Sequence, residues 1–132
     1  MKLRPGLFAI ATALLLGAAT PSVGQNMAEG KKLYETYCVA CHGEKGKGNG
    51  PAAQSLPAKP ADHTNGAVMN PLSDQFLNDI IAKGGSAVGK SSFMPSWGGA
   101  LNDKQIKDLS AYVRSLADPP YKPNATGKTS AK

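Results

Sequence analysis

Two cysteines and a histidine in one short segment are the residues of this chain best suited to chemistry. Cys38 and Cys41 are the only cysteines among 132 residues, and His42 follows the second one directly. This C-x-x-C-H spacing is the attachment pattern of c-type haem. Two thiols three positions apart can form thioethers with the vinyl groups on one porphyrin edge, and the adjacent imidazole then lies under the iron. We therefore predict one covalently bound haem c, with His42 as a metal ligand.

Three other interpretations of the cysteine pair are weaker. A disulfide at this spacing would close a very short loop and constrain little of the unfolded chain. A thioredoxin-like redox pair needs a preceding strand, whereas an amphipathic pattern typical of a helix leads into Cys38. A zinc site of Cys38, Cys41 and His63 would lack an obvious fourth ligand.

A second axial ligand must come from elsewhere in the chain. The candidates with a suitable lone pair are Met27, Met69, Met94, His63 and a lysine. Met94 stands out because it lies in a loop without helical periodicity, and Pro95 disfavours helix at Met94 itself. We predict Met94 as the second metal ligand, with His63, Met69 and an open position as the alternatives.

Three helices separated by loops rich in glycine and proline are expected to position these residues, and no strand alternation is visible. The first covers residues 27–39, where apolar and small residues recur every three or four positions. The last covers residues 103–117 and has the clearest start, because Asn102 is a good N-cap and Gln105 completes a capping box.

The second helix is predicted over residues 73–83. Ser73 can cap its start, and Gly84 with its neighbouring glycine ends it. Two long stretches without a recognisable element remain, residues 43–72 and 86–100. Loops of that length are unusual in a compact domain unless they wrap a large rigid ligand that replaces part of the core.

The N-terminus reads as a secretory signal peptide over residues 1–24. Lys2 and Arg4 precede an uncharged apolar run at residues 7–19, and small residues follow. About 13 apolar residues are too few for the roughly 20 that span a bilayer, so we expect no stable membrane insertion. Cleavage is predicted before Gln25, which places the mature protein in the periplasm.

The remaining sequence predicts one small domain. A haem-binding domain is expected over residues 25–118, followed by a mobile polar tail over residues 119–132. The formal net charge is +6, but the lysines are dispersed rather than clustered on one face with aromatic residues. That pattern argues against nucleic acid binding. The small size and the lack of a long hydrophobic face favour a monomer.

Several motifs taken together resemble a family. The cysteine motif follows a helix with Gly30 and Tyr34, Met94 precedes a proline in a loop, and a last helix contains the sequence DLSAYVRSL at residues 108–116. Over residues 27–117 the chain resembles a small class I cytochrome c from a bacterium.

The resemblance implies an all-α fold of three to four helices wrapped around one covalently bound haem, with the N- and C-terminal helices crossing near right angles. In the family a small residue and an aromatic residue of the first helix meet an aromatic residue of the last. Gly30, Tyr34 and Tyr112 occupy those positions. Glycine inside a helix costs about 1 kcal/mol relative to alanine, and a close helix approach would compensate for that cost.

Two further cofactor-binding residues follow from the resemblance. The family orients its proximal imidazole with a proline carbonyl shortly after the haem motif. Pro51 best matches that position, with Pro57 and Pro60 as alternatives. Trp97 is expected to pack against the haem edge or to donate its N–H group to a propionate.

The predicted function is one-electron transfer rather than catalysis. An iron with two protein ligands has no vacant position for a substrate, and a thioether ligand favours the reduced state. We expect a periplasmic carrier between a reductase or dehydrogenase and a terminal oxidase or reductase, with redox proteins as partners. Lys45 and Lys47 would steer the encounter weakly. The alternatives are a dedicated electron-accepting subunit of a periplasmic dehydrogenase complex and a five-coordinate catalytic haem.

Overall fold

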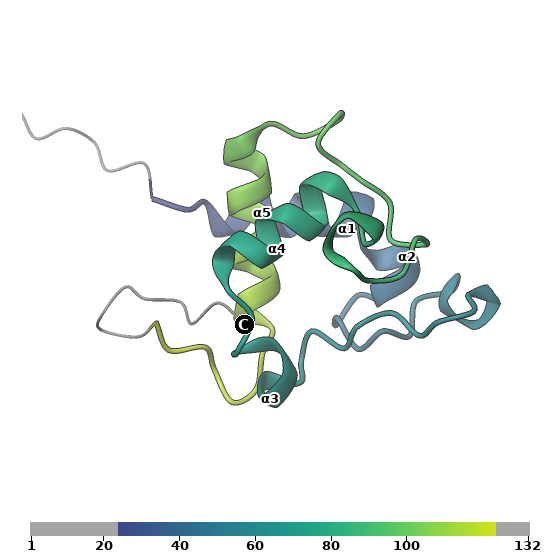
Figure 1. Ribbon diagram of the computed structural model, residues 1–132. Helices are drawn as coiled ribbons and strands as arrows, with labels where there is room; N and C mark the ends of the chain where they lie inside the picture. Colours follow the sequence, from purple (N-terminus) through teal and green to yellow (C-terminus); the bar gives the residue numbers. More distant parts are fainter. Residues whose placement is uncertain (1–23, 124–132) are drawn as a thin grey trace, which may run out of the picture.

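The computed structural model describes residues 24–123, and the regular elements among them are all helical (Figure 1). Most of the expected signal peptide and the end of the expected polar tail lie outside the described residues. The helices are α1 (Met27–Tyr37), α2 (Val39–His42), α3 (Gly66–Met69), α4 (Asp74–Lys83) and α5 (Asp103–Ser115), with 3-10 turns at Ala53–Ser55 and Ser86–Val88.

The three long helices lie where the sequence predicts them, and their starts are set by local capping. The Asn102 side chain accepts a hydrogen bond from the Gln105 N–H while the Gln105 side chain accepts one from the Asn102 N–H, so the capping box is present. Ser73 caps α4 through the N–H of Phe76. α4 begins one residue after the predicted start at Ser73, and α5 ends two residues before the predicted end at Ala117.

Two parts of the expected layout were wrong. The first helix does not continue to Val39, because the backbone changes course at Cys38 and a separate short helix, α2, follows. The two long stretches are not without elements, since residues 43–72 hold a 3-10 turn and α3, and residues 86–100 begin with a 3-10 turn. A four-residue helix such as α3 is too short to leave a recognisable periodicity in a sequence.

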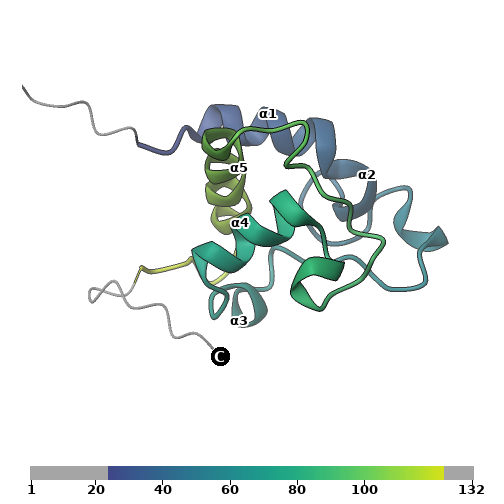
Figure 2. The same cartoon turned by 45° about the horizontal axis from the view of Figure 1, so that its top comes forward.

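α1 and α5 cross and form the main helix contact of the fold (Figure 2). A side chain at Gly30 would lie 2.2 Å from the Asp108 carbonyl oxygen and 2.9 Å from Tyr112 Cβ. Tyr34 is fully buried one turn later, with its ring centroid 5.3 Å from that of Tyr112. The sequence-based pairing of Gly30 and Tyr34 with Tyr112 is therefore confirmed.

Replacing Gly30 with alanine is expected to destabilise the protein. The added methyl group meets the backbone carbonyl of Asp108, which cannot move without separating α1 from α5. Overpacking of this kind costs about 1–3 kcal/mol, and alanine recovers only about 1 kcal/mol through its helix propensity. Denaturant unfolding should show the loss. An unchanged free energy of unfolding would mean that the helices can separate freely at this point.

α4 packs beside α5 and completes the core. Arg114 pairs with Asp74 and donates a hydrogen bond to the Leu72 carbonyl oxygen, which links the last turn of α5 to the start of α4. The Ser110 hydroxyl donates to the Asn78 side-chain oxygen at 2.7 Å. The buried apolar side chains come from all three long helices and the segments beside them: Leu33, Tyr34, Cys38, Met69, Leu77, Ile81, Leu101, Ile106, Leu109, Val113 and Ala117.

Two residues that follow the predicted domain end at residue 118 contact the helices. The Asn70 side-chain amide donates to the Pro119 carbonyl oxygen at 3.0 Å, and the Arg114 guanidinium lies 3.9 Å above the ring of Tyr121. These two contacts connect residues of the predicted tail to the end of α3 and to α5. Residues 124–132 lie outside the described residues.

Candidate functional site

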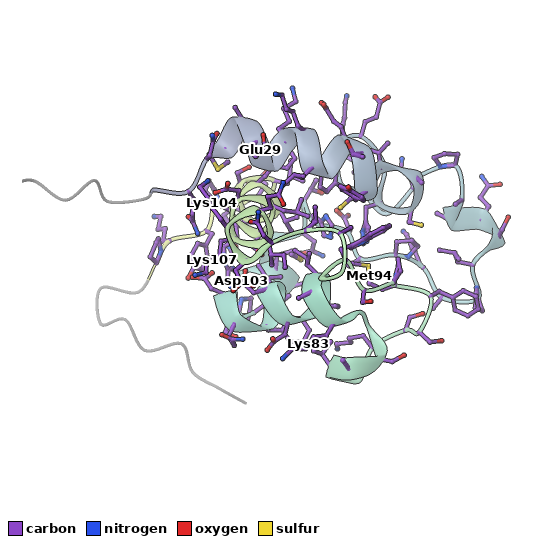
Figure 3. The ribbon with its side chains drawn as sticks, turned by 90° about the horizontal axis from the view of Figure 1, so that it is seen from above. Glu29, Lys83, Met94, Asp103, Lys104 and Lys107 are labelled. Atoms are coloured by element: carbon purple, nitrogen blue, oxygen red, sulfur yellow. The ribbon has the colours of Figure 1, made fainter. Side chains whose placement is uncertain are left out.

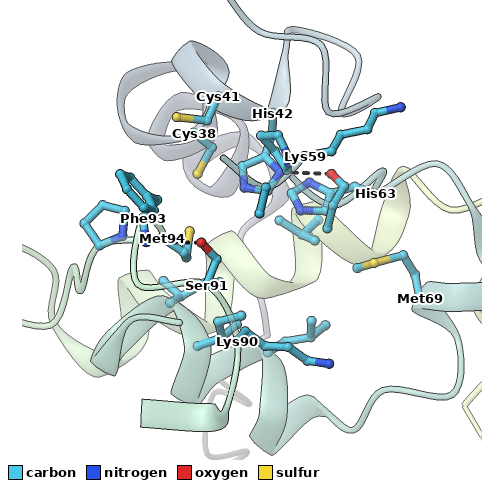
Figure 4. A pocket seen from close by; sticks show the side chains of 18 of the residues that line it. Cys38, Cys41, His42, Lys59, His63, Met69, Lys90, Ser91, Phe93 and Met94 are labelled. Carbon is cyan, nitrogen blue, oxygen red and sulfur yellow. Dashed lines mark hydrogen bonds between the residues drawn. The ribbon is translucent and has the colours of Figure 1, made fainter. Parts of the chain in front are cut away.

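A cavity of about 450 Å³ lies between α2, α4 and the two long loops. Its wall contains five of the six predicted site residues. Figure 4 shows the cysteines and His42 on one wall and Met94 on the facing loop. Most of the lining is aliphatic or aromatic. The predicted residues in the lining are Cys38, Cys41, His42, Met94 and Trp97, and Pro51 is not among them.

The helix α2 places both cysteines on the cavity. Cys38 ends α1 and precedes α2, and its carbonyl oxygen accepts hydrogen bonds from the N–H groups of Cys41 at 3.2 Å and His42 at 2.8 Å. Burial raises the pKa of the Cys38 thiol to about 12, and the neighbouring Cys41 adds to the increase. A thiol that stays protonated is a poor redox nucleophile, which argues against the thioredoxin-like interpretation.

The zinc interpretation also fails on geometry. Within residues 24–123 no group of three or more histidine, cysteine, aspartate or glutamate side chains is arranged to hold a metal ion. The three residues of the zinc interpretation, Cys38, Cys41 and His63, therefore do not form a metal site.

The His42 ring is oriented by a backbone carbonyl, as expected, but not by that of Pro51. Its Nδ1–H donates to the Ala61 carbonyl oxygen at 3.0 Å. Burial lowers the pKa of His42, so the ring is neutral and keeps a lone pair on Nε2.

Pro51 is held behind α2 by the backbone pairing of its neighbours. The N–H of Gly50 donates to the Cys41 carbonyl oxygen at 3.0 Å, and the N–H of Ala52 donates to the Ala40 carbonyl oxygen at 2.9 Å. A side chain at Gly50 would lie 2.4 Å from the Ala40 carbonyl oxygen, so the chain passes very close to the helix here. The loop returns to the imidazole only at Ala61, which corrects the prediction for Pro51.

The loop that carries Met94 is fastened to the end of α4. The Met94 carbonyl oxygen accepts a hydrogen bond from the backbone N–H of Gly85 at 2.9 Å. The backbone N–H of Trp97 donates to the Ile81 carbonyl oxygen at 2.9 Å. A side chain at Gly85 would lie 2.0 Å from the Ser91 carbonyl oxygen, so only glycine allows the loop to fold back here. In Figure 3 Met94 lies between α1 and α4, on the side of the molecule away from Lys104.

The other candidate axial ligands are placed differently. Met27 is 42% exposed at the start of α1 and does not line the cavity. Met69 does line it but is a member of the buried core, 3% exposed. His63 is stacked on His42, with ring centroids 4.2 Å apart, so it lies beside His42 rather than facing it. Met94 and Met69 are thus the methionines that line the cavity from segments other than that of His42.

Trp97 lies at the cavity wall and packs against Tyr37, with ring centroids 4.9 Å apart. This contact connects the Met94 loop to the last turn of α1, close to Cys38. This contact holds Trp97 at the cavity wall, where both of its expected roles would require it.

Two residues of the site carry no signal in the sequence. Lys59 and Lys90 provide the positive charges of the cavity wall, and among the described residues no carboxylate lines it. Figure 4 shows both ammonium groups on the side away from Cys38 and Cys41. Isolated lysines in long loops look like ordinary surface residues, and only the fold brings these two to one cavity.

Comparison with known proteins settles which family has this arrangement. The family model of cytochrome c matches residues 27–117, which is most of the chain. This chain is a class I c-type cytochrome. Membership of this family implies covalently bound haem c and a role in carrying electrons.

The cytochrome has relatives of two kinds. It is 32% identical over 109 residues to cytochrome c6 of Thermosynechococcus vestitus, covering 83% of this chain and 87% of the relative. It is 34% identical over 93 residues to the Cbb3-type cytochrome c oxidase subunit FixP of Bradyrhizobium diazoefficiens, covering 70% of this chain. The matched region is only 28% of the length of FixP.

Solved structures support the fold. The KustC0563 c-type cytochrome superposes with a TM-score of 0.55 at 24% identity, over 67% of this cytochrome and 96% of that chain. A chain of the Kuenenia stuttgartiensis reducing HAO-like protein complex gives a TM-score of 0.57 over 76% of this cytochrome and 49% of that chain. Within residues 24–123 no helix has the length and apolar character needed to cross a bilayer.

The residues of the cavity fit a haem. The volume lies in the range of cofactor sites, and the lining is apolar where a porphyrin ring would contact it. Cys38 and Cys41 provide two thiols on one wall, and His42 provides a neutral imidazole. Lys59 and Lys90 of the wall would provide cations for the two carboxylates of the cofactor.

Proposed function

We propose that this cytochrome is a periplasmic one-electron carrier with a single haem c, ligated by His42 and Met94. The observation that carries the proposal is that one cavity joins a C-x-x-C-H motif to a methionine on a separate, fastened loop. Two axial ligands leave no position for a substrate, which favours electron transfer over catalysis.

The side chains of the site have separate tasks in this proposal. Cys38 and Cys41 tether the cofactor through thioethers, which prevents its loss outside the cytoplasm. His42 presents the Nε2 lone pair, because its Nδ1–H is committed to the Ala61 carbonyl oxygen. Met94 presents a soft sulfur donor, which favours the reduced state. Haem c supplies an iron that gains and loses one electron.

The apolar wall limits the reorganisation that accompanies electron transfer. Leu77 and Ile81 of α4 are 3% and 5% exposed and line the cavity together with Phe76 and Ile80. Rigid apolar side chains exclude water, so few dipoles must reorient when the charge of the site changes. This is the property that a carrier needs, because the protein itself undergoes no chemical step.

The opening of the cavity is a suitable place for electron exchange. Phe93 and Val68 are each 56% exposed, and both line the cavity together with Lys59 and Lys90. Exposed apolar side chains and cations around the cavity fit a redox partner that combines an apolar contact with acidic residues. The lysine pair predicted from the sequence, Lys45 and Lys47, is exposed but does not line the cavity.

A second candidate function is supported by the relatives. FixP and CcoP are named as subunits of Cbb3-type cytochrome c oxidases, so a chain of this kind can serve as a fixed electron-transferring unit of a larger complex. The matched region is under a third of their length, and the cytochrome c6 match instead spans most of its relative. The cytochrome c6 match favours a mobile carrier.

Mass and visible spectra of the exported protein test the proposal. We expect a mass that exceeds the polypeptide by one haem and a reversible change between oxidised and reduced spectra. The oxidised form should also have the weak red absorption band of iron–methionine ligation. A colourless protein of polypeptide mass would refute the proposal. Purification from the native membrane and soluble fractions distinguishes a free carrier from a subunit held in a complex.

A further inference from the structure

His63 is a buried histidine that the proposed electron transfer does not use. Its side chain is 8% exposed, and its ring is stacked on that of His42 with a centroid distance of 4.2 Å and an interplanar angle of 19°. Burying an imidazole in an apolar wall is costly unless the ring makes compensating contacts. An ordinary packing position would be better filled by an aliphatic side chain.

The His63 ring has a hydrogen-bond partner that fixes its tautomer. Tyr34 Oη lies 3.1 Å from the Gly43 carbonyl oxygen and 3.4 Å from His63 Nδ1. A phenol has one proton, and the carbonyl can only accept, so Tyr34 donates to Gly43 and His63 Nδ1–H donates to Tyr34 Oη. The Tyr34 hydroxyl therefore connects Gly43, which directly follows His42, to the His63 ring that is stacked on His42.

The backbone of His63 is also held in place. Its N–H donates to the Gly46 carbonyl oxygen at 2.7 Å. Gly46 has φ +75°, and a side chain there would lie 3.2 Å from His63 Cβ and 2.9 Å from Leu116 Cδ1. The loop after the haem motif and the loop around His63 are therefore packed against each other with no spare volume.

A continuous series of rings connects the helix crossing to the proximal ligand. Tyr112 of α5 contacts Tyr34 of α1 with ring centroids 5.3 Å apart. Tyr34 meets the edge of His63 at 5.9 Å and 68°, and His63 is stacked on His42. The main helix contact of the fold thus reaches the imidazole of His42 through two intermediate rings.

We propose that His63 is a positioning residue that sets the ring plane of His42, with Tyr34 as its support. The inference rests on the proposed function, in which His42 is an axial ligand. The Ala61 carbonyl fixes the direction of the His42 Nδ1–H bond, but one hydrogen bond leaves the ring free to rotate about that direction. The parallel face of His63 removes this freedom, so the imidazole has one orientation in both oxidation states.

Electron paramagnetic resonance of the oxidised holoprotein tests this role, because the g values of low-spin haem iron depend on the plane of the axial imidazole. In His63→Leu we expect the wild-type signal to shift and broaden or to split into two, while the covalent haem and the iron–methionine band are retained. Tyr34→Phe keeps the ring but removes the hydroxyl, so a smaller change in the same direction is expected. His63→Phe restores the stacked ring and should return the signal toward the wild-type shape.

Ile106→Val is the matched control, because Ile106 is 5% exposed in the core but does not line the cavity. It should lower the unfolding temperature without moving the signal. If His63→Leu leaves the g values and line widths unchanged and only lowers the unfolding temperature, His63 is ordinary core packing and the inference is overturned. If the wild-type protein has no low-spin haem signal, the proposed function fails instead, so the two failures are distinguishable.

Discussion

Replacing both Cys38 and Cys41 with alanine should abolish covalent haem attachment. The two thiols are the only ones in the chain, so no other side chain can form a thioether. The double variant is expected to have the mass of the polypeptide alone and to lose its visible colour after denaturation and gel filtration. Loss of all covalent haem from the variant, against one haem in the wild type, is the largest effect expected for any change in this protein.

The fold should weaken together with the attachment. An empty cavity in a protein core costs about 24 cal/mol per Å³, so a volume of about 450 Å³ sets an upper bound on the order of 10 kcal/mol. That bound is comparable with the whole stability of a small domain. Circular dichroism of the double variant should therefore show lower helix content or a much lower unfolding temperature than the holoprotein.

Single cysteine variants separate attachment from folding. Cys41→Ala keeps the thiol of Cys38 and should form one thioether in reduced yield. Cys38→Ala is expected to mature less well, because Cys38 is the more buried of the two and also joins α1 to α2. A double variant that still carries covalent haem would show that the attachment does not use this motif.

The parts of the fold that could be predicted from the sequence are those fixed by local chemistry. The start of α5 depends on Asn102 and Gln105, which are three positions apart and need no distant partner. The close approach of α1 and α5 could be predicted at Gly30, because glycine inside a helix costs free energy that a close helix contact can offset. The haem motif could also be predicted, because its three residues lie within five consecutive positions.

The parts that could not be predicted depend on the course of the long loops. Any residue has a carbonyl oxygen, so nothing in the sequence distinguishes Ala61 from Pro51 as the partner of His42. The contact of His63 with His42 joins positions 21 residues apart through a loop without periodicity. Such contacts follow from packing around the cavity, and a resemblance to the family does not determine them.

Replacing Met94 with alanine should keep the haem attached but change its electronic properties. Loss of the soft sulfur donor removes the preference for reduced iron, so the reduction potential should fall, on the order of 0.1 V given that axial ligands span about 0.8 V. The oxidised variant should lose the iron–methionine band and bind cyanide, while the reduced variant should bind carbon monoxide. Potentiometric titration and ligand-binding spectra measure these effects.

Met69→Leu is the control for this assignment, because Met69 also lines the cavity and leucine keeps its volume and polarity. It should leave the potential and the band in place. Gly85→Ala tests the same assignment through the backbone: its methyl group would meet the Ser91 carbonyl oxygen and displace the Met94 loop without removing the sulfur. A weakened band in Gly85→Ala with retained haem is expected, because Met94 then reaches the iron in only part of the molecules. If Met69→Leu loses the band while Met94→Ala keeps it, the sulfur ligand is Met69, and the fastening of the Met94 loop serves the fold alone.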